Sequence, residues 1–74
     1  MMIDINPAVE QKAFAEGLQK YPAMEQFPAR LVWRPLAQGG AFFLQYDKQP
    51  PREHPDAWEF QNTVVKAYKR LAGV

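Results

Sequence analysis

The chain offers very few side chains that could carry out covalent or metal-dependent chemistry. It contains no cysteine, no serine, a single threonine, Thr63, and a single histidine, His54. Nucleophilic catalysis needs a hydroxyl or thiol beside a base, and a metal site needs several imidazole, thiolate or carboxylate ligands. His54 lies between Glu53 and Asp56 and precedes a proline, a setting that favours a role in a turn or helix cap. The sequence therefore predicts a protein that is not an enzyme and that holds no cofactor and no metal.

Three groups of residues have side chains suited to binding a partner, because arginine and aromatic residues are enriched where proteins dock. The first alternates along two predicted strands and so shares one face; it consists of Arg30, Val32, Arg34, Phe43 and Gln45. The second is basic and ends the last predicted helix, where a solvated face beside the negative end of the helix dipole is the simplest interpretation. It consists of Lys66, Lys69 and Arg70. The third is Trp58, which either covers the edge of the core or meets a partner helix.

The first group is the main candidate surface, and the sequence leaves three interpretations of it open. A partner protein could bind Val32 and Phe43 between the two arginines, the N-terminal segment 3–5 could cover them, or a second copy of the chain could do so. Binding of nucleic acid is disfavoured. Only Phe43 is expected to be an outward-facing aromatic residue, whereas RNA-binding sheets stack bases on two or three of them.

Size and composition predict one compact domain over residues 1–74. Disulfides cannot stabilise the domain because the chain has no cysteine. The content of 47% apolar and 14% aromatic residues is enough to form a hydrophobic core instead. The net charge of +1 is small, although residues 1–27 carry −2, residues 28–50 carry +2 and residues 51–74 carry +1. No signal peptide or membrane span is recognisable, and the lack of cysteine fits a reducing compartment, so we expect a cytoplasmic protein that does not enter the membrane.

The first segment predicts an amphipathic helix that begins at Pro7, with Asn6 as its cap, and ends before Pro22. Its apolar stripe is Val9, Ala13, Phe14, Gly17, Leu18 and Tyr21. Because glycine costs about 1 kcal/mol of helix propensity, Gly17 indicates a close approach by another element. The connector 22–28 allows a short helical turn from Pro22, with Met24 and Phe27 packed on the core.

Residues 29–36 and 41–47 predict a β-hairpin. Leu31 and Trp33 alternate onto one face of the first strand, and the second strand places three apolar residues on the same face. These are Phe42, Leu44 and Tyr46. Gly39 and Gly40 supply the positive φ angles of a tight turn. A loop of two or four residues places Trp33 opposite Leu44 or Tyr46. Pro35 indicates an exposed strand edge, because proline has no N–H group to donate to a neighbouring strand.

The last segment predicts a second helix after the stiff linker 48–54. We expect Pro55 at its first position and Gly73 as its terminator. Its apolar stripe is Ala57, Phe60, Val64, Ala67, Tyr68 and Leu71. The fold class that follows is α+β: a small two-layer domain of order helix–strand–strand–helix, with an antiparallel hairpin packed on two helices.

The function predicted from these features is a small non-enzymatic protein-interaction module, an adaptor or inhibitor of a larger protein. It would bind through the outer hairpin face and the flank of the C-terminal helix. Two alternatives remain: a self-assembling structural subunit, such as a homodimer, or a weak nucleic-acid-binding module. The order of elements is similar to that of small head–tail joining proteins of tailed phages, in order alone.

Overall fold

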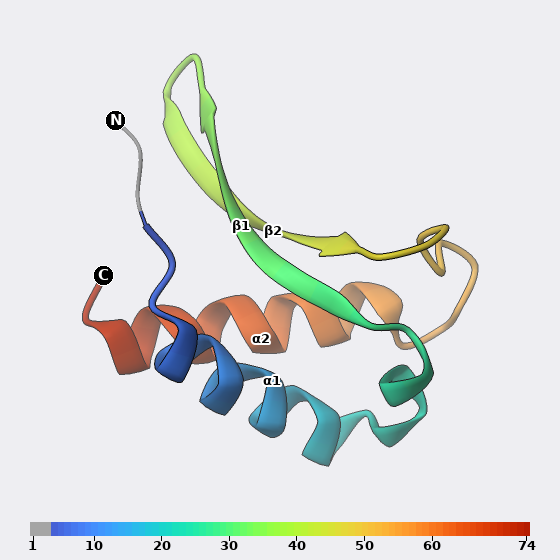
Figure 1. The fold of residues 1–74 in the computed structure, drawn as a ribbon. Coiled ribbons are helices and arrows are strands. Elements are labelled where there is room, and N and C mark those ends of the chain that lie inside the picture. Colours follow the sequence, from blue (N-terminus) through green and yellow to red (C-terminus); the bar gives the residue numbers. More distant parts are fainter. Residues whose placement is uncertain (1–3) are drawn as a thin grey trace.

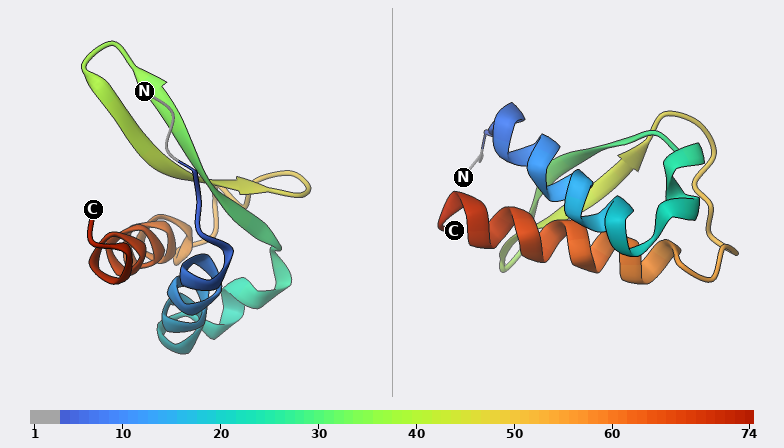
Figure 2. Two further views of the ribbon diagram at one scale, coloured as in Figure 1. Left: turned by 60° about the vertical axis from the view of Figure 1, so that its left-hand side comes forward. Right: turned by 90° about the horizontal axis from the view of Figure 1, so that it is seen from below.

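The computed structural model describes residues 4–74 and has two layers, with a two-stranded antiparallel sheet on one side and two helices on the other (Figures 1 and 2). The elements along the chain are α1 (Pro7–Lys20), the 3₁₀ helix η1 (Pro22–Gln26), β1 (Ala29–Leu36), β2 (Gly39–Tyr46) and α2 (Ala57–Ala72). The α+β class and the predicted order of elements are confirmed. The half of the hairpin nearest its turn projects beyond the helices (Figure 1).

Local sequence signals set the bounds of α1. The side-chain oxygen of Asn6 accepts hydrogen bonds from the backbone N–H groups of Ala8 and Val9, at 3.0 and 3.3 Å, so the predicted cap is confirmed. Pro22 follows the end of the helix and opens η1, and Met24 from that turn is buried, as expected.

The two helices lie side by side and antiparallel (Figure 2). The helices approach closely at Gly17, because a Cβ atom built there would lie 2.7 Å from Val64 Cγ2 and 2.9 Å from Phe60 Cε1. The predicted reason for a glycine at this position is thereby confirmed. The Tyr68 hydroxyl accepts a hydrogen bond of 2.9 Å from the backbone N–H of Asn6 and ties the start of α1 to the far end of α2.

The hairpin has the predicted faces but a different turn. The loop is Ala37 and Gln38, and β2 begins at Gly39 and ends at Tyr46, so the expected span 41–47 and the Gly39–Gly40 turn are wrong. Of these two glycines, only Gly39 has a positive φ, of 116°. Gly40 is a strand residue that leaves room for an indole, since a Cβ atom there would lie 2.3 Å from Trp33 Cζ2.

Trp33 pairs with Phe42 rather than with Leu44 or Tyr46. The reason is that the turn is formed by Ala37 and Gln38, two residues before the expected glycine pair. The two rings meet edge to face, with centroids 4.9 Å apart. All four of these residues still share the face that packs on the helices, because a register change of two residues preserves the face.

The linker 48–54 leads into α2 two residues later than expected. The helix begins at Ala57, while Pro55 and Asp56 form a turn in which the Asp56 N–H donates to His54 Nδ1 at 3.1 Å. His54 therefore has the expected turn role. Gly73 ends the helix with a left-handed φ of 75°, as predicted. Leu71 is 42% exposed, so its assignment to the buried stripe is wrong.

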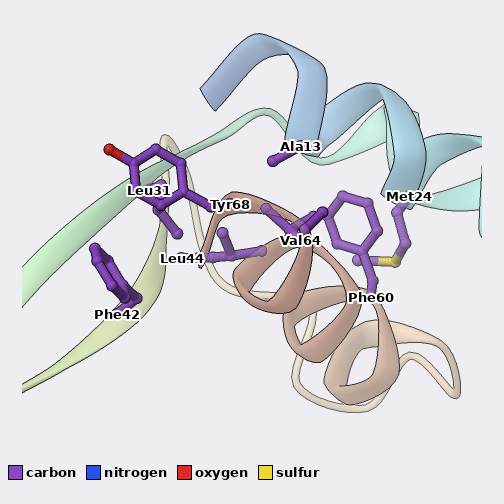
Figure 3. Packing of buried hydrophobic residues seen from close by; sticks show 9 residues of the cluster. Ala13, Met24, Leu31, Phe42, Leu44, Phe60, Val64 and Tyr68 are labelled. Atoms are coloured by element: carbon purple, nitrogen blue, oxygen red, sulfur yellow. The ribbon is translucent and has the colours of Figure 1, made fainter. Parts of the chain in front are cut away.

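The core lies between the two layers and receives side chains from every element (Figure 3). Its buried members are Ala13, Met24, Leu31, Phe42, Leu44, Phe60, Val64, Ala67 and Tyr68. The sheet contributes only three of them, so the helix pair and η1 supply most of the buried apolar volume. Both helices pack on the same face of the sheet, and within residues 4–74 no element forms a layer over the other face.

Candidate protein-interaction surface

The outer face of the hairpin carries the first predicted group in one block. Val32 pairs with Phe43 at its centre, Arg30 pairs with Gln45 on one side, and Arg34 pairs with Ala41 on the other. Residues opposite each other in an antiparallel pair share a face, so an apolar pair lies between two arginines. Arg30, Arg34 and Gln45 are exposed, whereas Val32 and Phe43 are half-buried.

Both helices lie on the other side of the hairpin, and Ile5 packs against the buried cluster between the layers. Ile5 therefore does not cover the outer face; Ile3 lies outside the described residues. Among the strand aromatics, Phe43 alone belongs to this face, because the register places Trp33 and Phe42 on the inner one. One aromatic residue is too few for a base-stacking platform.

A cleft of about 430 Å³ lies beside β2, and it brings Phe43 and Trp58 together. Its other walls come from the linker and from the first turns of α2, chiefly Pro50, Pro51 and Gln61. Trp58 is 70% exposed, the largest exposed fraction among the large apolar residues described. Two residues that the sequence placed in separate groups therefore form one site, which we call the Phe43–Trp58 cleft.

The proline pair of the linker forms one wall of the cleft. Consecutive prolines fix φ and hold the chain extended, so residues 50–51 form a wall rather than collapsing onto β2. Arg52 follows them and also lines the cleft. The site predicted from the sequence did not include Pro50, Pro51 or Arg52. The signal for them was a proline pair followed by an arginine, shortly before the helix that carries Trp58.

Arg52 is the only side chain lining the cleft that carries a charge at neutral pH. Partial burial raises the pKa of the Tyr46 hydroxyl, so this ring at the cleft stays neutral. Neither the strand residues of the outer face nor the cleft lining includes an aspartate or glutamate. Four acidic residues directly adjoin lining residues in the chain: Asp47, Glu53, Asp56 and Glu59. The lining of the cleft is therefore apolar with one cation, and the outer strand face adds Arg30 and Arg34.

Both edges of the sheet are occupied by side chains from the helices. The backbone N–H of Leu31 donates to Glu10 Oε2 of α1 at 2.7 Å, and that of Leu44 donates to Gln61 Oε1 of α2 at 3.3 Å. Pro35 has no N–H to offer on β1. These contacts occupy one backbone N–H group in the middle of each edge, which opposes the addition of a further strand there.

The basic group is separate from this surface. Lys66 and Arg70 line a groove formed only by residues of the two helices, and Arg70 forms an ion pair with Glu16 of α1. Lys69 is exposed. The structure thus brings Trp58 to the hairpin surface but not Lys66, Lys69 or Arg70.

Comparison with protein-family models, with curated proteins and with solved structures finds no match for this chain. Within residues 4–74, no helix is both long enough and apolar enough to cross a membrane. The same residues contain no group of three or more His, Cys, Asp or Glu side chains arranged to hold a metal ion.

Proposed function

We propose that this chain is a small non-enzymatic protein-interaction module of the cytoplasm. It binds a larger protein, as an adaptor or inhibitor, through the outer hairpin face and the Phe43–Trp58 cleft. The observation that carries the proposal is a tryptophan that is 70% exposed beside an apolar cleft of about 430 Å³. Concave apolar sites with a few polar groups, and exposed aromatic residues near them, are typical of binding surfaces.

The energy available at this site is sufficient for an anchor contact. Covering an exposed indole removes on the order of 150 Å² of apolar surface from water, worth about 4 kcal/mol before the costs of association. Trp58 packs little within its own chain, so removing its side chain costs the fold little. Burial by a partner is therefore the arrangement in which this residue contributes most.

The test uses the purified protein as bait in a lysate of the organism that produces it. We expect one protein to be captured by the wild type, lost with Trp58→Ala and Phe43→Asp, and retained with Lys69→Glu as the matched control on the other surface. Circular dichroism confirms that each variant is folded. Capture that survives both Trp58→Ala and Phe43→Asp in folded protein would refute the proposed surface.

The alternative is a self-assembling structural subunit, and the uncovered Val32–Phe43 pair is the observation in its favour. Two copies stacked through this face would bring four arginines, Arg30 and Arg34 of each copy, into an interface whose strand residues include no carboxylate, which opposes the contact. Light scattering over a wide concentration range separates the two functions. A stable dimer that Phe43→Asp dissociates would replace the interaction module with the self-assembling subunit.

A further inference from the structure

Three arginines surround the apolar part of the proposed surface, and none of them has an acidic partner in the part of the chain that the structure describes. Arg30 and Arg34 flank Val32 and Phe43 on the hairpin, while Arg52 lines the cleft. The single ion pair among residues 4–74 joins Glu16 to Arg70 on the helices. The positive charge of this surface is thus left for a ligand to neutralise.

The dimensions favour a short peptide segment. Arg30 and Arg34 are four residues apart on one strand, about 13 Å at a rise of ~3.3 Å per residue. The cleft volume of about 430 Å³ lies within the usual range for ligand pockets, roughly 300–1,000 Å³. An extended segment of four or five residues is long enough to span the two arginines. Phe43 belongs to both the outer face and the cleft and so joins the two parts of the surface.

A second copy of the chain does not fit this surface well. Its first helix is not acidic, because Lys12 and Lys20 balance Glu10 and Glu16. Both of these carboxylates are also engaged: Glu10 accepts from the Leu31 N–H, and Glu16 pairs with Arg70. Addition of a strand is also opposed, because Leu31 and Leu44 already donate their N–H groups to helix side chains. A separate acidic segment is therefore the better occupant.

We propose that the partner presents a short acidic–apolar segment to this surface. One bulky apolar side chain fills the Phe43–Trp58 cleft, and neighbouring Asp or Glu carboxylates meet Arg30, Arg34 and Arg52. Arginine pairs with carboxylates through two parallel hydrogen bonds, so the three arginines select for acidic residues on either side of the anchor. This inference rests on the proposed function and adds the chemistry of the partner to it.

The experiment uses a displayed library of random twelve-residue peptides, selected on the full-length protein. We expect the enriched peptides to carry Leu, Ile, Phe or Trp next to Asp or Glu. Replacing the acids of a selected peptide by Asn or Gln should weaken its binding about tenfold or more, as should raising the salt concentration. Fluorescence polarisation of labelled peptides measures both effects.

Variants of the protein locate the contact. Arg34→Glu and Arg52→Glu should each weaken binding about tenfold, whereas Lys69→Glu, the matched charge reversal on the helix face, should change it less than twofold. Trp58→Phe keeps Trp33 as the remaining fluorophore and should abolish the peptide-induced shift in tryptophan emission. All four variants lie at exposed positions, and thermal melts confirm that they fold.

The outcomes separate the two proposals. Peptides that need Trp58 and Phe43 but show no preference for Asp or Glu would overturn the acidic partner and leave the interaction module standing. Peptides whose affinity is unchanged by Trp58→Ala and Phe43→Asp would overturn both. A dominance of basic peptides, or a library without any Trp58-dependent binder, would also overturn the acidic segment.

Discussion

The two faces of the hairpin are built by alternate residues of the same strands, yet they have opposite environments. On the inner face Leu31, Phe42 and Leu44 are 3%, 6% and 9% exposed. On the outer face Val32 and Phe43 are equally apolar in type but only half-buried, and arginines flank them. The two faces share one backbone and differ only in what packs against them. Burial is thus set by the helical layer, which among residues 4–74 covers only the inner face.

The largest expected effect comes from truncating neighbouring phenylalanines that point to opposite faces. Phe42→Ala should lower the free energy of unfolding by about 3–5 kcal/mol, because it opens a cavity beside Trp33 and Tyr68. Phe43→Ala should lower it by about 1 kcal/mol or less. Urea denaturation followed by circular dichroism measures both values. Equal losses would show that the outer face is also part of the core.

Near the turn, the difference between the inner and outer faces is tested by adding a methyl group to the inner face. Gly40→Ala should destabilise by about 1–3 kcal/mol, since the new methyl group overlaps the Trp33 indole on the inner face. Gln45→Ala, on the outer face, should stay within about 0.5 kcal/mol of the wild type. Thermal melts of the two variants give the difference. A neutral Gly40→Ala would mean that the indole moves freely away.

The sheet edges provide a third contrast. Glu10→Ala removes the charged acceptor of the Leu31 N–H and should cost about 1–2 kcal/mol. Gln61→Ala removes a longer, neutral hydrogen bond to Leu44 and should cost about 1 kcal/mol or less. Chemical denaturation ranks the two variants, and amide exchange at Leu31 and Leu44 reports each edge separately. The opposite ranking would show that β2 depends more on its helix than β1 does.

The smallest expected effect belongs to the helix face that carries the basic residues. Glu16 and Arg70 form an ion pair with side chains 43% and 63% exposed, so a double-mutant cycle should give a coupling energy below about 1 kcal/mol. The coupling should fall further at high salt. Guanidinium is itself a salt, so urea is the suitable denaturant. A larger coupling would place this pair among the residues that hold the helices together.

Much of the fold could be predicted because its signals are local. Asn6 before Pro7 fixed the start of α1, alternation of apolar residues separated the two faces of the hairpin, and Gly73 marked the end of α2. The turn was placed wrongly because two adjacent glycines have two separate roles. Gly39 adopts a positive φ, whereas Gly40 makes room for Trp33, which is a contact between strands that the local sequence does not display.

The sequence by itself determined the elements, their order, the inner and outer faces of the strands and the close approach at Gly17. These follow from capping, periodicity and side-chain size, which act over a few residues. Only the tertiary structure decided that Phe43 and Trp58 share a cleft, that Glu10 and Gln61 occupy the strand edges, and that the basic residues of α2 lie on another surface. Such contacts depend on how the layers are turned against each other, and that geometry is set by the packing of the whole core.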